Sequence, residues 1–331
     1  MKIKIAVVGT GNVARKNYLP FLSQQEDVML SYYNRTRNKA EGCADQFGGW
    51  VADSIDHLMQ DSPDAVLMLT RETVRYELAL QVLQHQPKRV FFEKPLVAQQ
   101  DQAHVTEDDF EKGRELLRTA RANGTQTAMV FNYRFFDQTM LARQIAAERN
   151  FGQLIQVNGF VHYACWSHSI DLIHLFGGPV AQITALSGVV EHTTSSMKAQ
   201  DVAAAFVTEQ GATGTILGTS GTSFAFPLYE LLFSFEGGRL TLRGLDGDME
   251  VLDYSGKRHE LFNLTRGTSQ WDQYSRSFEK SMDAYLDAIR ANDEPPVPGT
   301  AGLQELQFEA ALKRSIRLNR PVDVQTEFPL A

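Results

Sequence analysis

The first 130 residues alternate short apolar runs with segments of helical periodicity. The apolar runs have the length of buried strands, and the segments between them repeat hydrophobic residues three or four positions apart. This alternation predicts βαβ units, and hence a parallel sheet with helices on both faces. The predicted strands are residues 3–8, 28–33, 65–69, 90–92 and 127–131, and the predicted helices include residues 12–23, 37–47 and 74–84.

The pattern changes after about residue 130, where strand-like runs follow one another with few helices. Turn signals such as Glu209-Gln210-Gly211 and Glu236-Gly237-Gly238 indicate largely antiparallel pairing. We therefore predict an α/β Rossmann domain with a doubly wound parallel sheet over residues 1–128. An α+β domain with a large mixed, mainly antiparallel, open-faced sheet is predicted over residues 129–331. Its predicted strands are 154–163, 183–190, 202–207, 214–219, 231–235, 239–243 and 250–252, and its helices are 137–149, 168–176, 275–291 and 303–318.

Composition narrows the possible partners and the compartment. The 331 residues carry a formal charge of −8 and 43% hydrophobic residues, typical of soluble globular proteins. Basic residues are scattered, so neither nucleic acid nor a membrane surface is expected as a partner. No secretory signal or apolar span occurs, and Cys43 and Cys165 lie outside any CxxC spacing. We expect a cytoplasmic protein with free thiols.

A GxGxxA motif, Gly9-Thr10-Gly11-Asn12-Val13-Ala14, follows the first predicted strand and opens the first predicted helix. Glycine permits the tight turn and the close approach of the backbone to a pyrophosphate, and the start of a helix offers unpaired N–H groups to it. This context predicts a dinucleotide site whose contacts come from Gly9, Thr10, Gly11, Asn12 and Val13.

The end of the second predicted strand indicates which coenzyme is bound. An NAD-binding protein usually places Asp or Glu there to bind the adenosine ribose, but this chain has Asn34 followed by Arg35-Thr36-Arg37. No carboxylate repels a 2′-phosphate, and guanidinium groups can bind one. We therefore expect NADP(H) to be preferred over NAD(H), with Asn34, Arg35 and Thr36 in contact. The alternative is that Arg35 and Arg37 only flank a solvated helix start.

An apolar strand that ends in Glu93-Lys94-Pro95 completes a set of motifs by which the chain resembles the Gfo/Idh/MocA family of pyridine-nucleotide oxidoreductases. Each motif is weak alone, but their order along the chain is specific. The other matching segments are 9–14, 64–66, 132–135, 151–155, 168–171, 201–203, 211–214, 277–278 and 298–303.

The resemblance implies reversible hydride transfer between nicotinamide C4 and a carbinol or ketone carbon of a sugar, inositol or sugar derivative. Lys94 matches the catalytic lysine of the family, and a lysine can stabilise the developing oxyanion and deliver a proton. Thr70, Glu93 and Lys94 are expected beside the coenzyme. The family loop close to TPxxxH reads Thr70-Arg71-Glu72-Thr73-Val74-Arg75 here, so Arg71 and Arg75 face either the nicotinamide half or solvent.

His168 stands where the family carries a second proton-transfer residue, but the usual DxGxH pattern is altered. Ala164 replaces its Asp and Trp166 replaces its Gly. Either Tyr163 or Asp171 orients His168 instead, or the relay is changed, or reduction has been lost. The candidate substrate-binding residues are Tyr133, Arg134, Tyr163 and Asp171, because hydroxyl and guanidinium groups suit sugar oxygens or an acidic substituent. Tyr133 and Arg134 are equally well explained as a packing pair at a hinge.

A metal site is not expected, although His162, Cys165, His168, Asp171 and His174 follow at intervals of three. His162 ends a predicted strand, and three-residue steps along one helix drift by about 60° each, so that His168 and His174 lie about 120° apart. Cys165 is expected to fill a small apolar space beside aromatic residues.

The sequence therefore predicts an NADP-dependent oxidoreductase of the Gfo/Idh/MocA type, with Lys94 and His168 as catalytic residues. The family commonly buries the open face of its second sheet against another subunit, so a homodimer or homotetramer is expected. Two alternatives share the fold. One is a sensor that binds NADP and a ligand without turnover, and the other is a reductase of a non-sugar such as a linear tetrapyrrole, similar to biliverdin reductase.

Overall fold

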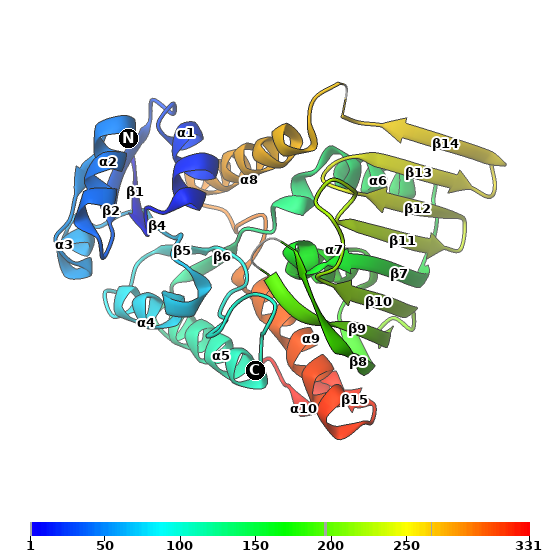
Figure 1. Ribbon diagram of the computed structural model, residues 1–331. Helices are drawn as coiled ribbons and strands as arrows, with labels where there is room; N and C mark the ends of the chain where they lie inside the picture. Colours follow the sequence, from blue (N-terminus) through cyan, green and yellow to red (C-terminus); the bar gives the residue numbers. More distant parts are fainter. Residues whose placement is uncertain (1, 195–196, 266) are drawn as a thin grey trace. The chain divides into compact units, whose positions relative to one another are not determined.

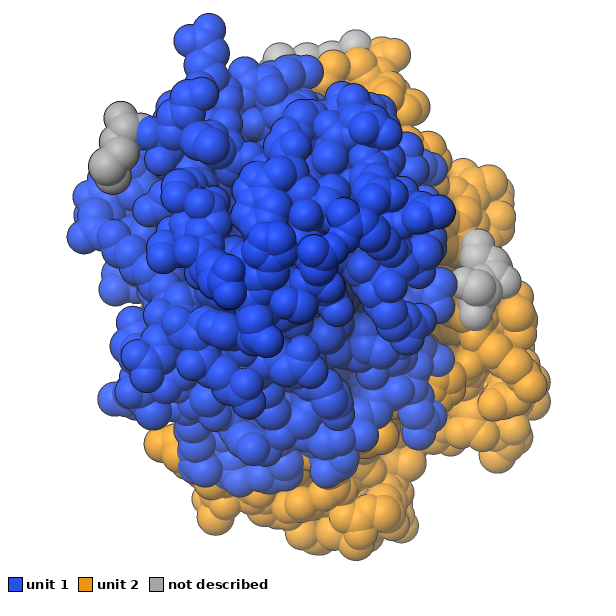
Figure 2. All heavy atoms as spheres, turned by 90° about the vertical axis from the view of Figure 1, so that its left-hand side faces the viewer, with its two compact units in different colours: residues 1–101, 108–131, 278–306 blue, residues 102–107, 132–277, 307–331 orange. Residues whose placement is uncertain are grey.

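The computed structural model describes residues 2–194, 197–265 and 267–331. The chain forms two compact units, which Figure 2 colours separately. Unit 1 comprises residues 1–101, 108–131 and 278–306, and unit 2 comprises residues 102–107, 132–277 and 307–331. The single boundary expected between residues 128 and 129 does not describe this division, because residues 278–306 return to unit 1. Local periodicity cannot show which sheet a late segment packs against.

Unit 1 is built on a parallel sheet of six described strands in the order β3-β2-β1-β4-β5-β6 (Figure 1). Neighbours pair in parallel throughout, which confirms the predicted doubly wound sheet. Strand order reverses at β1, between β2 and β4, and in such sheets ligands bind at the carboxyl ends of these strands. The strands are β1 (Ile3–Val8), β2 (Val28–Tyr33), β3 (Trp50–Val51), β4 (Ala65–Met68), β5 (Arg89–Phe92) and β6 (Gln126–Met129).

Helices cover both faces of this sheet, and β4 and β5 are buried at every position, as a doubly covered sheet requires. Helices α8 and α9 belong to unit 1 over residues 278–291 and 299–306. The helices are α1 (Leu19–Leu22), α2 (Arg37–Phe47), α3 (Ile55–Gln60), α4 (Glu72–Leu83), α5 (Glu107–Ala122), α8 (Gln270–Ala291) and α9 (Gly299–Leu318).

The first predicted helix, residues 12–23, is not a regular α-helix. It contains a π-helix, η1 (Ala14–Tyr18), and continues as α1 with Pro20 near its start. The Leu19 N–H donates to the carbonyl oxygen of Ala14, five residues back. Proline has no N–H and its ring clashes with the carbonyl four residues earlier, so the wider turn accommodates Pro20.

Unit 2 contains a sheet of nine described strands in the order β14-β13-β12-β11-β7-β10-β9-β8-β15. Described neighbours pair antiparallel except β7 and β10, which are parallel, so the predicted mixed, mainly antiparallel sheet is confirmed. The strands are β7 (Leu154–His162), β8 (Val180–Thr194), β9 (Met197–Thr208), β10 (Thr213–Thr219), β11 (Tyr229–Phe235), β12 (Gly238–Arg243), β13 (Asp248–Asp253), β14 (Arg258–Asn263) and β15 (Val322–Asp323).

One face of this sheet is covered and the other is open. Helix α7 packs on β7 and β11, and α6 packs on β12 and β13. Along β9, β10 and residues 182–186 of β8 buried and exposed residues mostly alternate, as expected for a sheet with one solvated face. The remaining elements of unit 2 are η2 (Asn132–Phe135), α6 (Asp137–Glu148), η3 (Tyr163–Cys165), α7 (Trp166–Gly177) and α10 (Val324–Glu327).

Candidate functional site

The glycine loop after β1 passes very close to the loop after β4. Gly9 has a φ of +100°, a conformation that favours glycine. A Cβ atom on Gly9 would lie 2.7 Å from the backbone nitrogen of Thr70, which is closer than real Cβ contacts allow. The Gly9 N–H donates to the carbonyl oxygen of Tyr33, at the end of β2, over 2.9 Å. Glycine is therefore required here for both its conformation and its lack of a side chain.

The surroundings of this loop suit the phosphates of a dinucleotide. A Cβ atom on Gly11 would meet nothing within 4 Å, and Asn12 and Val13 follow at the surface. The Thr70 Oγ1 atom is buried and has no hydrogen-bond partner among the described residues. The exposed backbone around Gly11 and the buried hydroxyl of Thr70 can donate hydrogen bonds to a phosphate. These residues therefore fit the pyrophosphate of a dinucleotide.

Asn34 connects the glycine loop to the turn that follows β2. Its Oδ1 accepts a hydrogen bond from the Thr10 N–H over 3.2 Å, and its Nδ2 donates to the carbonyl oxygen of Thr36 over 2.9 Å. Arg35 and Thr36 are exposed. Arg37 is ion-paired with other residues of its own unit, at 2.7 Å from Glu41 Oε1 and also with Asp53. Arg35 and Arg37 are thus both exposed, and Arg37 is the one whose guanidinium is held in ion pairs.

The carboxylate of Glu93, at the end of β5, is fixed at both oxygens. Its Oε1 accepts a hydrogen bond from the Tyr18 hydroxyl over 2.6 Å, and its Oε2 accepts one from the backbone N–H of Lys94 over 3.0 Å. Glu93 is 7% exposed, whereas Lys94 is half-buried. The two side chains therefore differ in role: Glu93 is part of the interior, and the Lys94 amine extends from a backbone that Glu93 anchors.

Arg75 holds the same loop from the other direction. This residue of α4 is 1% exposed and donates to the carbonyl oxygen of Thr70 over 2.7 Å, and also to the carbonyl oxygens of Glu93 and Pro95. Burial lowers the pKa of Arg75, and the Glu93 carboxylate opposes that shift. The guanidinium thus joins the loops after β4 and β5, and it faces neither solvent nor an open site. Of the two arginines of this segment, Arg71 is the exposed one.

In unit 2 His168 lies in the first turns of α7, which begins at Trp166, two residues before the predicted start. His168 is 1% exposed, and its ring stacks on that of Tyr133, with centroids 3.9 Å apart and planes 14° apart. The Tyr133 hydroxyl donates to Cys165 Sγ over 3.2 Å. The structure therefore brings the two candidates His168 and Tyr133 together. The Tyr133 hydroxyl is already used in a hydrogen bond to Cys165.

The other candidates of unit 2 have polar groups that are also engaged. The Arg134 Nε atom donates to Asp171 Oδ2 over 2.8 Å, and a second bond joins Arg134 Nη2 to Asp171 Oδ1. Burial raises the pKa of Asp171, and the Arg134 charge opposes that rise. The Tyr163 hydroxyl donates to the carbonyl oxygen of Gln200 over 2.8 Å. The substrate-binding roles expected for these residues stay predictions.

No group of three or more His, Cys, Asp or Glu side chains among the described residues is arranged to hold a metal ion. Of the five residues spaced at intervals of three, Asp171 is paired with Arg134, and the His162 Nδ1 atom accepts from the backbone N–H of Ala164 over 3.0 Å. Within the same described ranges, no helix is long and apolar enough to cross a membrane.

The predicted site residues thus fall into two sets, one in each unit. Tyr18 is a site residue that sequence analysis missed, and Arg75 is one whose role it left open. A tyrosine within an otherwise apolar helix face, nine residues after the first motif glycine, is the only signal for Tyr18. Unit 1 holds Gly9, Thr10, Gly11, Asn12, Val13, Asn34, Arg35, Thr36, Thr70, Glu93 and Lys94, and unit 2 holds Tyr133, Arg134, Tyr163, His168 and Asp171.

A parallel sheet with a glycine-lined loop at its switch point defines a dinucleotide-binding α/β protein. Comparison of the sequence with known families agrees with this class. Residues 3–131 match the Gfo/Idh/MocA family, described as an oxidoreductase family with an NAD-binding Rossmann fold. This match confirms the resemblance expected from the motifs, and these residues form an NAD(P)-binding Rossmann domain.

Individual relatives are distant. The chain is 23% identical over 160 residues to glucose-6-phosphate 3-dehydrogenase of Bacillus subtilis (strain 168). These 160 residues are 48% of this chain and 42% of that relative, so the chain aligns with less than half of the relative's length. An oxidoreductase of Agrobacterium radiobacter in complex with NAD+, L-tartaric acid and magnesium has a TM-score of 0.81 at 15% identity, over 99% of this chain and 100% of that one. A super-repressor mutant of Gal80p from Saccharomyces cerevisiae has a TM-score of 0.82 at 11% identity, over 98% of each chain. At such identities the two structures establish the fold alone.

Proposed function

We propose that this protein is an NADP(H)-dependent oxidoreductase that transfers a hydride between nicotinamide C4 and a carbinol or ketone carbon of a sugar, inositol or sugar derivative. The family of residues 3–131 and the sugar-phosphate substrate in the name of the Bacillus subtilis relative support the class. The observation that carries the proposal is the way Arg75 and Glu93 fix the backbone on both sides of Lys94, at the carboxyl edge of the sheet that also carries Gly9.

The coenzyme contacts follow from the geometry of unit 1. The backbone around Gly11 and the Thr70 hydroxyl would hold the pyrophosphate, and Arg35 would bind the 2′-phosphate of NADP(H). The nicotinamide ring supplies or accepts the hydride when the coenzyme is bound. Asn34 keeps the ribose end of the site free of negative charge, because its amide is neutral and both of its polar atoms are bonded within the loops.

Lys94 acts on the oxygen of the reacting carbon. During reduction that oxygen gains negative charge, and the ammonium group of Lys94 stabilises it and donates the proton. In the reverse direction the neutral amine accepts the hydroxyl proton. His168 supplies a second proton-transfer group, since imidazole exchanges protons near neutral pH. Glu93 holds the backbone N–H of Lys94 in place and takes no part in proton transfer.

A second function has specific support in the sequence around His168. Ala164 and Trp166 replace two residues of the family pattern, and one structure of similar fold is a super-repressor mutant of Gal80p. A sensor that binds NADP(H) and a ligand without turnover would need the glycine loop but would not need a proton-transfer residue. Turnover therefore separates the two functions, whereas coenzyme binding does not.

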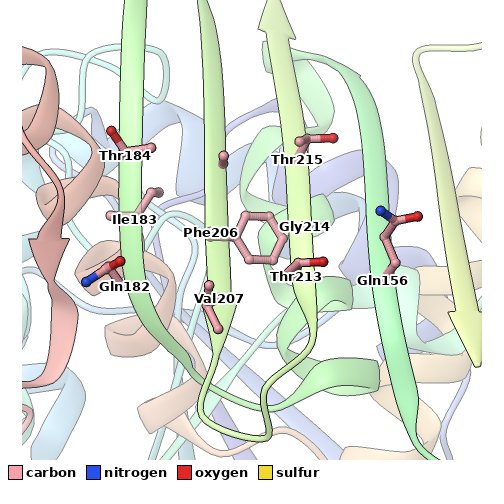
Figure 3. A pocket seen from close by; sticks show the side chains of 10 residues that line it. Gln156, Gln182, Ile183, Thr184, Phe206, Val207, Thr213, Gly214 and Thr215 are labelled. Carbon is pink, nitrogen blue, oxygen red and sulfur yellow. The ribbon is translucent and has the colours of Figure 1, made fainter.

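We also propose that a second copy of the chain covers the open face of the unit 2 sheet. Cross-strand register places twelve outward-facing residues of β7, β8, β9 and β10 in three rows, and all twelve are uncharged. Figure 3 shows part of this face, around a hollow of about 290 Å³. Interface centres are depleted in charge in the same way. The rows are Gln182-Val207-Thr213-Gln156, Thr184-Ala205-Thr215-Asn158 and Leu186-Ala203-Leu217-Phe160.

The proposed reaction is tested by measuring loss of NADPH absorbance with a panel of aldoses, keto-sugars, inositols and nucleotide sugars. With a sugar that responds, Lys94→Ala is expected to lower kcat by at least about 100-fold, within the range of proton-transfer catalysis. Lys313→Ala is the matched control, because it removes a lysine of unit 2 that has no proposed role. Activity of Lys94→Ala within about tenfold of the parent would remove this lysine from the chemistry. NADPH binding without turnover of any panel member favours the sensor.

A further inference from the structure

The group that orients His168 is the open question left by Ala164. Where the family pattern has a carboxylate four residues before the histidine, this chain has a methyl group. The two substitutes that the sequence offers are engaged elsewhere, since the Tyr163 hydroxyl donates to Gln200 and the Asp171 carboxylate binds Arg134. A different contact of the His168 ring has to be considered.

Tyr133 makes a face-to-face ring contact with His168. The two rings are almost parallel, with centroids 3.9 Å apart, which is van der Waals contact between faces. Tyr133 is itself fixed on several sides. Its hydroxyl donates to Cys165, and its ring stacks on Phe136 at 4.4 Å and on Tyr229 at 5.5 Å. Tyr133 is 2% exposed, so the surface that it presents to the imidazole is rigid.

A neighbouring ion pair fixes the register of this contact. Arg134, the next residue of η2, binds Asp171 of α7, which lies three positions after His168. Residues three apart on a helix share a face, so two adjacent residues of η2 contact the same face of α7. The ion pair prevents η2 from sliding along α7, and Tyr133 therefore stays opposite His168.

We propose that Tyr133 is the positioning residue of His168, and that its ring face does what the missing carboxylate does in the family pattern. This inference rests on the proposed function, because it assigns a role to a residue that acts through His168. A carboxylate fixes an imidazole at its edge and selects one tautomer. An aromatic face fixes the plane of the ring, leaves the edge nitrogens to other partners, and favours the protonated form through the negative charge density of its π face.

The test uses protein labelled with ¹³C at histidine Cε1 and follows the His168 signal by NMR as a function of pH. The signal is assigned by its loss in His168→Gln. Tyr133→Phe keeps the ring and removes the hydroxyl, whereas Tyr133→Leu removes the aromatic face. We expect Tyr133→Phe to keep the titration midpoint of the parent, and Tyr133→Leu to lower it by about half a pH unit. With a responding sugar, Tyr133→Leu is expected to lower kcat and leave KM nearly unchanged.

A folded Tyr133→Leu protein with the midpoint and line width of the parent overturns the proposal. So does an equal shift in Tyr133→Phe, because the hydroxyl bond to Cys165 would then be responsible. Tyr133→Met, whose unbranched side chain adapts more readily to the space, gives the same comparison if Tyr133→Leu does not fold. Failure of the proposed function is a separate result, since a parent that turns over no sugar still yields the His168 titration.

Discussion

The hydroxyl of Tyr18 donates a 2.6 Å hydrogen bond to Glu93 Oε1, across 75 residues of sequence. Tyr18 closes the π-helix after the glycine loop, and Glu93 precedes Lys94 at the end of β5. The same ring packs edge-on against Phe91 and Phe278, so its orientation is fixed. The segment that follows the coenzyme loop and the strand end that carries the proposed catalytic amine are therefore held together by one buried bond.

Removal of that bond is expected to destabilise the protein. Tyr18→Phe keeps the ring and leaves one oxygen of a buried carboxylate without its donor, which costs about 1.5–3 kcal/mol of unfolding free energy. Urea unfolding followed by circular dichroism measures the loss. Tyr254→Phe is the matched control, because Tyr254 is 50% exposed. Equal stability of Tyr18→Phe and the parent would show that the bond contributes nothing in solution.

The loss of Arg75 is expected to be more severe. Arg75→Met removes the donor from three carbonyl oxygens, two of them in fully buried bonds, and removes a cation that interacts with the Glu93 carboxylate, at a cost of about 3–5 kcal/mol. Arg75→Lys keeps the charge, but a single ammonium cannot reproduce the planar fork, so an intermediate loss is expected. Arg71→Met alters an exposed residue of the same loop and is expected to unfold like the parent. Thermal and urea unfolding of the three variants give the comparison.

Coenzyme preference is expected to depend on Arg35 and not on Arg37. Arg35→Ala removes a surface guanidinium and should weaken NADPH binding by about tenfold with NADH binding unchanged, the value of one charge-assisted hydrogen bond. Arg37→Ala should change neither affinity, because Glu41 and Asp53 already hold that side chain. Fluorescence titration of the parent and both variants with NADPH and NADH measures the affinities. Equal affinity of the parent for NADPH and NADH contradicts the role of Arg35.

Assembly is expected to depend on the uncharged face of the unit 2 sheet. Leu217→Glu places a charge in its apolar row, next to Ala203 and Phe160 in register, and burial of that charge opposes association. We expect sedimentation velocity to show a dimer or tetramer for the parent and a smaller species for the variant. Val74→Glu is the control, since Val74 is a 42% exposed apolar residue of α4 in unit 1. A monomeric parent would rule out the proposed assembly.

Acid is expected to destabilise the protein through His174. Burial lowers its pKa to about 4 from 6.5, and the charge of Arg134 adds to that shift. The folded protein therefore resists a proton that the unfolded chain binds. The stabilisation is complete above pH 6.5 and is lost as the pH falls toward 4, with a loss of about 2 kcal/mol between pH 7.5 and pH 5.0.

The measurement for this prediction is urea unfolding of the parent and His174→Gln at pH 7.5 and pH 5.0. Between pH 7.5 and pH 5.0 the unfolding free energy of the variant should fall by about 2 kcal/mol less than that of the parent. His57→Gln is the control, since the His57 side chain is 46% exposed. A variant that keeps the full pH dependence of the parent would assign it to other groups.

Much of the fold could be predicted from sequence because buried parallel strands are short apolar runs. The ends of β1, β2 and α2 agree with the predicted residues 3–8, 28–33 and 37–47. Errors occur where local pattern is weak. The two-residue strand β3 is too short to have a period, and α8 begins at Gln270, five residues before the predicted start, with residues of mixed polarity.

The candidate site could be predicted only where a short sequence motif is by itself typical of a function. The glycine loop and the strand end with Lys94 are of this kind. The bonds that support them join residues far apart in sequence, such as Tyr18 to Glu93 and Arg75 to Pro95. The same is true of the contact between Tyr133 and His168. Periodicity contains no information on which distant side chains meet, so these supporting residues are visible only in three dimensions.

The return of residues 278–306 to unit 1 has a consequence for biosynthesis. The Met129 N–H of β6 donates to the carbonyl oxygen of Val297, and Ala128 forms a β-bridge with Pro298. The outer edge of the nucleotide-binding sheet is therefore closed by a segment that a ribosome makes only after all the strands from β7 to β14. A nascent chain released near residue 131 would present that edge to other molecules, so the nucleotide-binding sheet is expected to be complete only after residues 278–306 have been made.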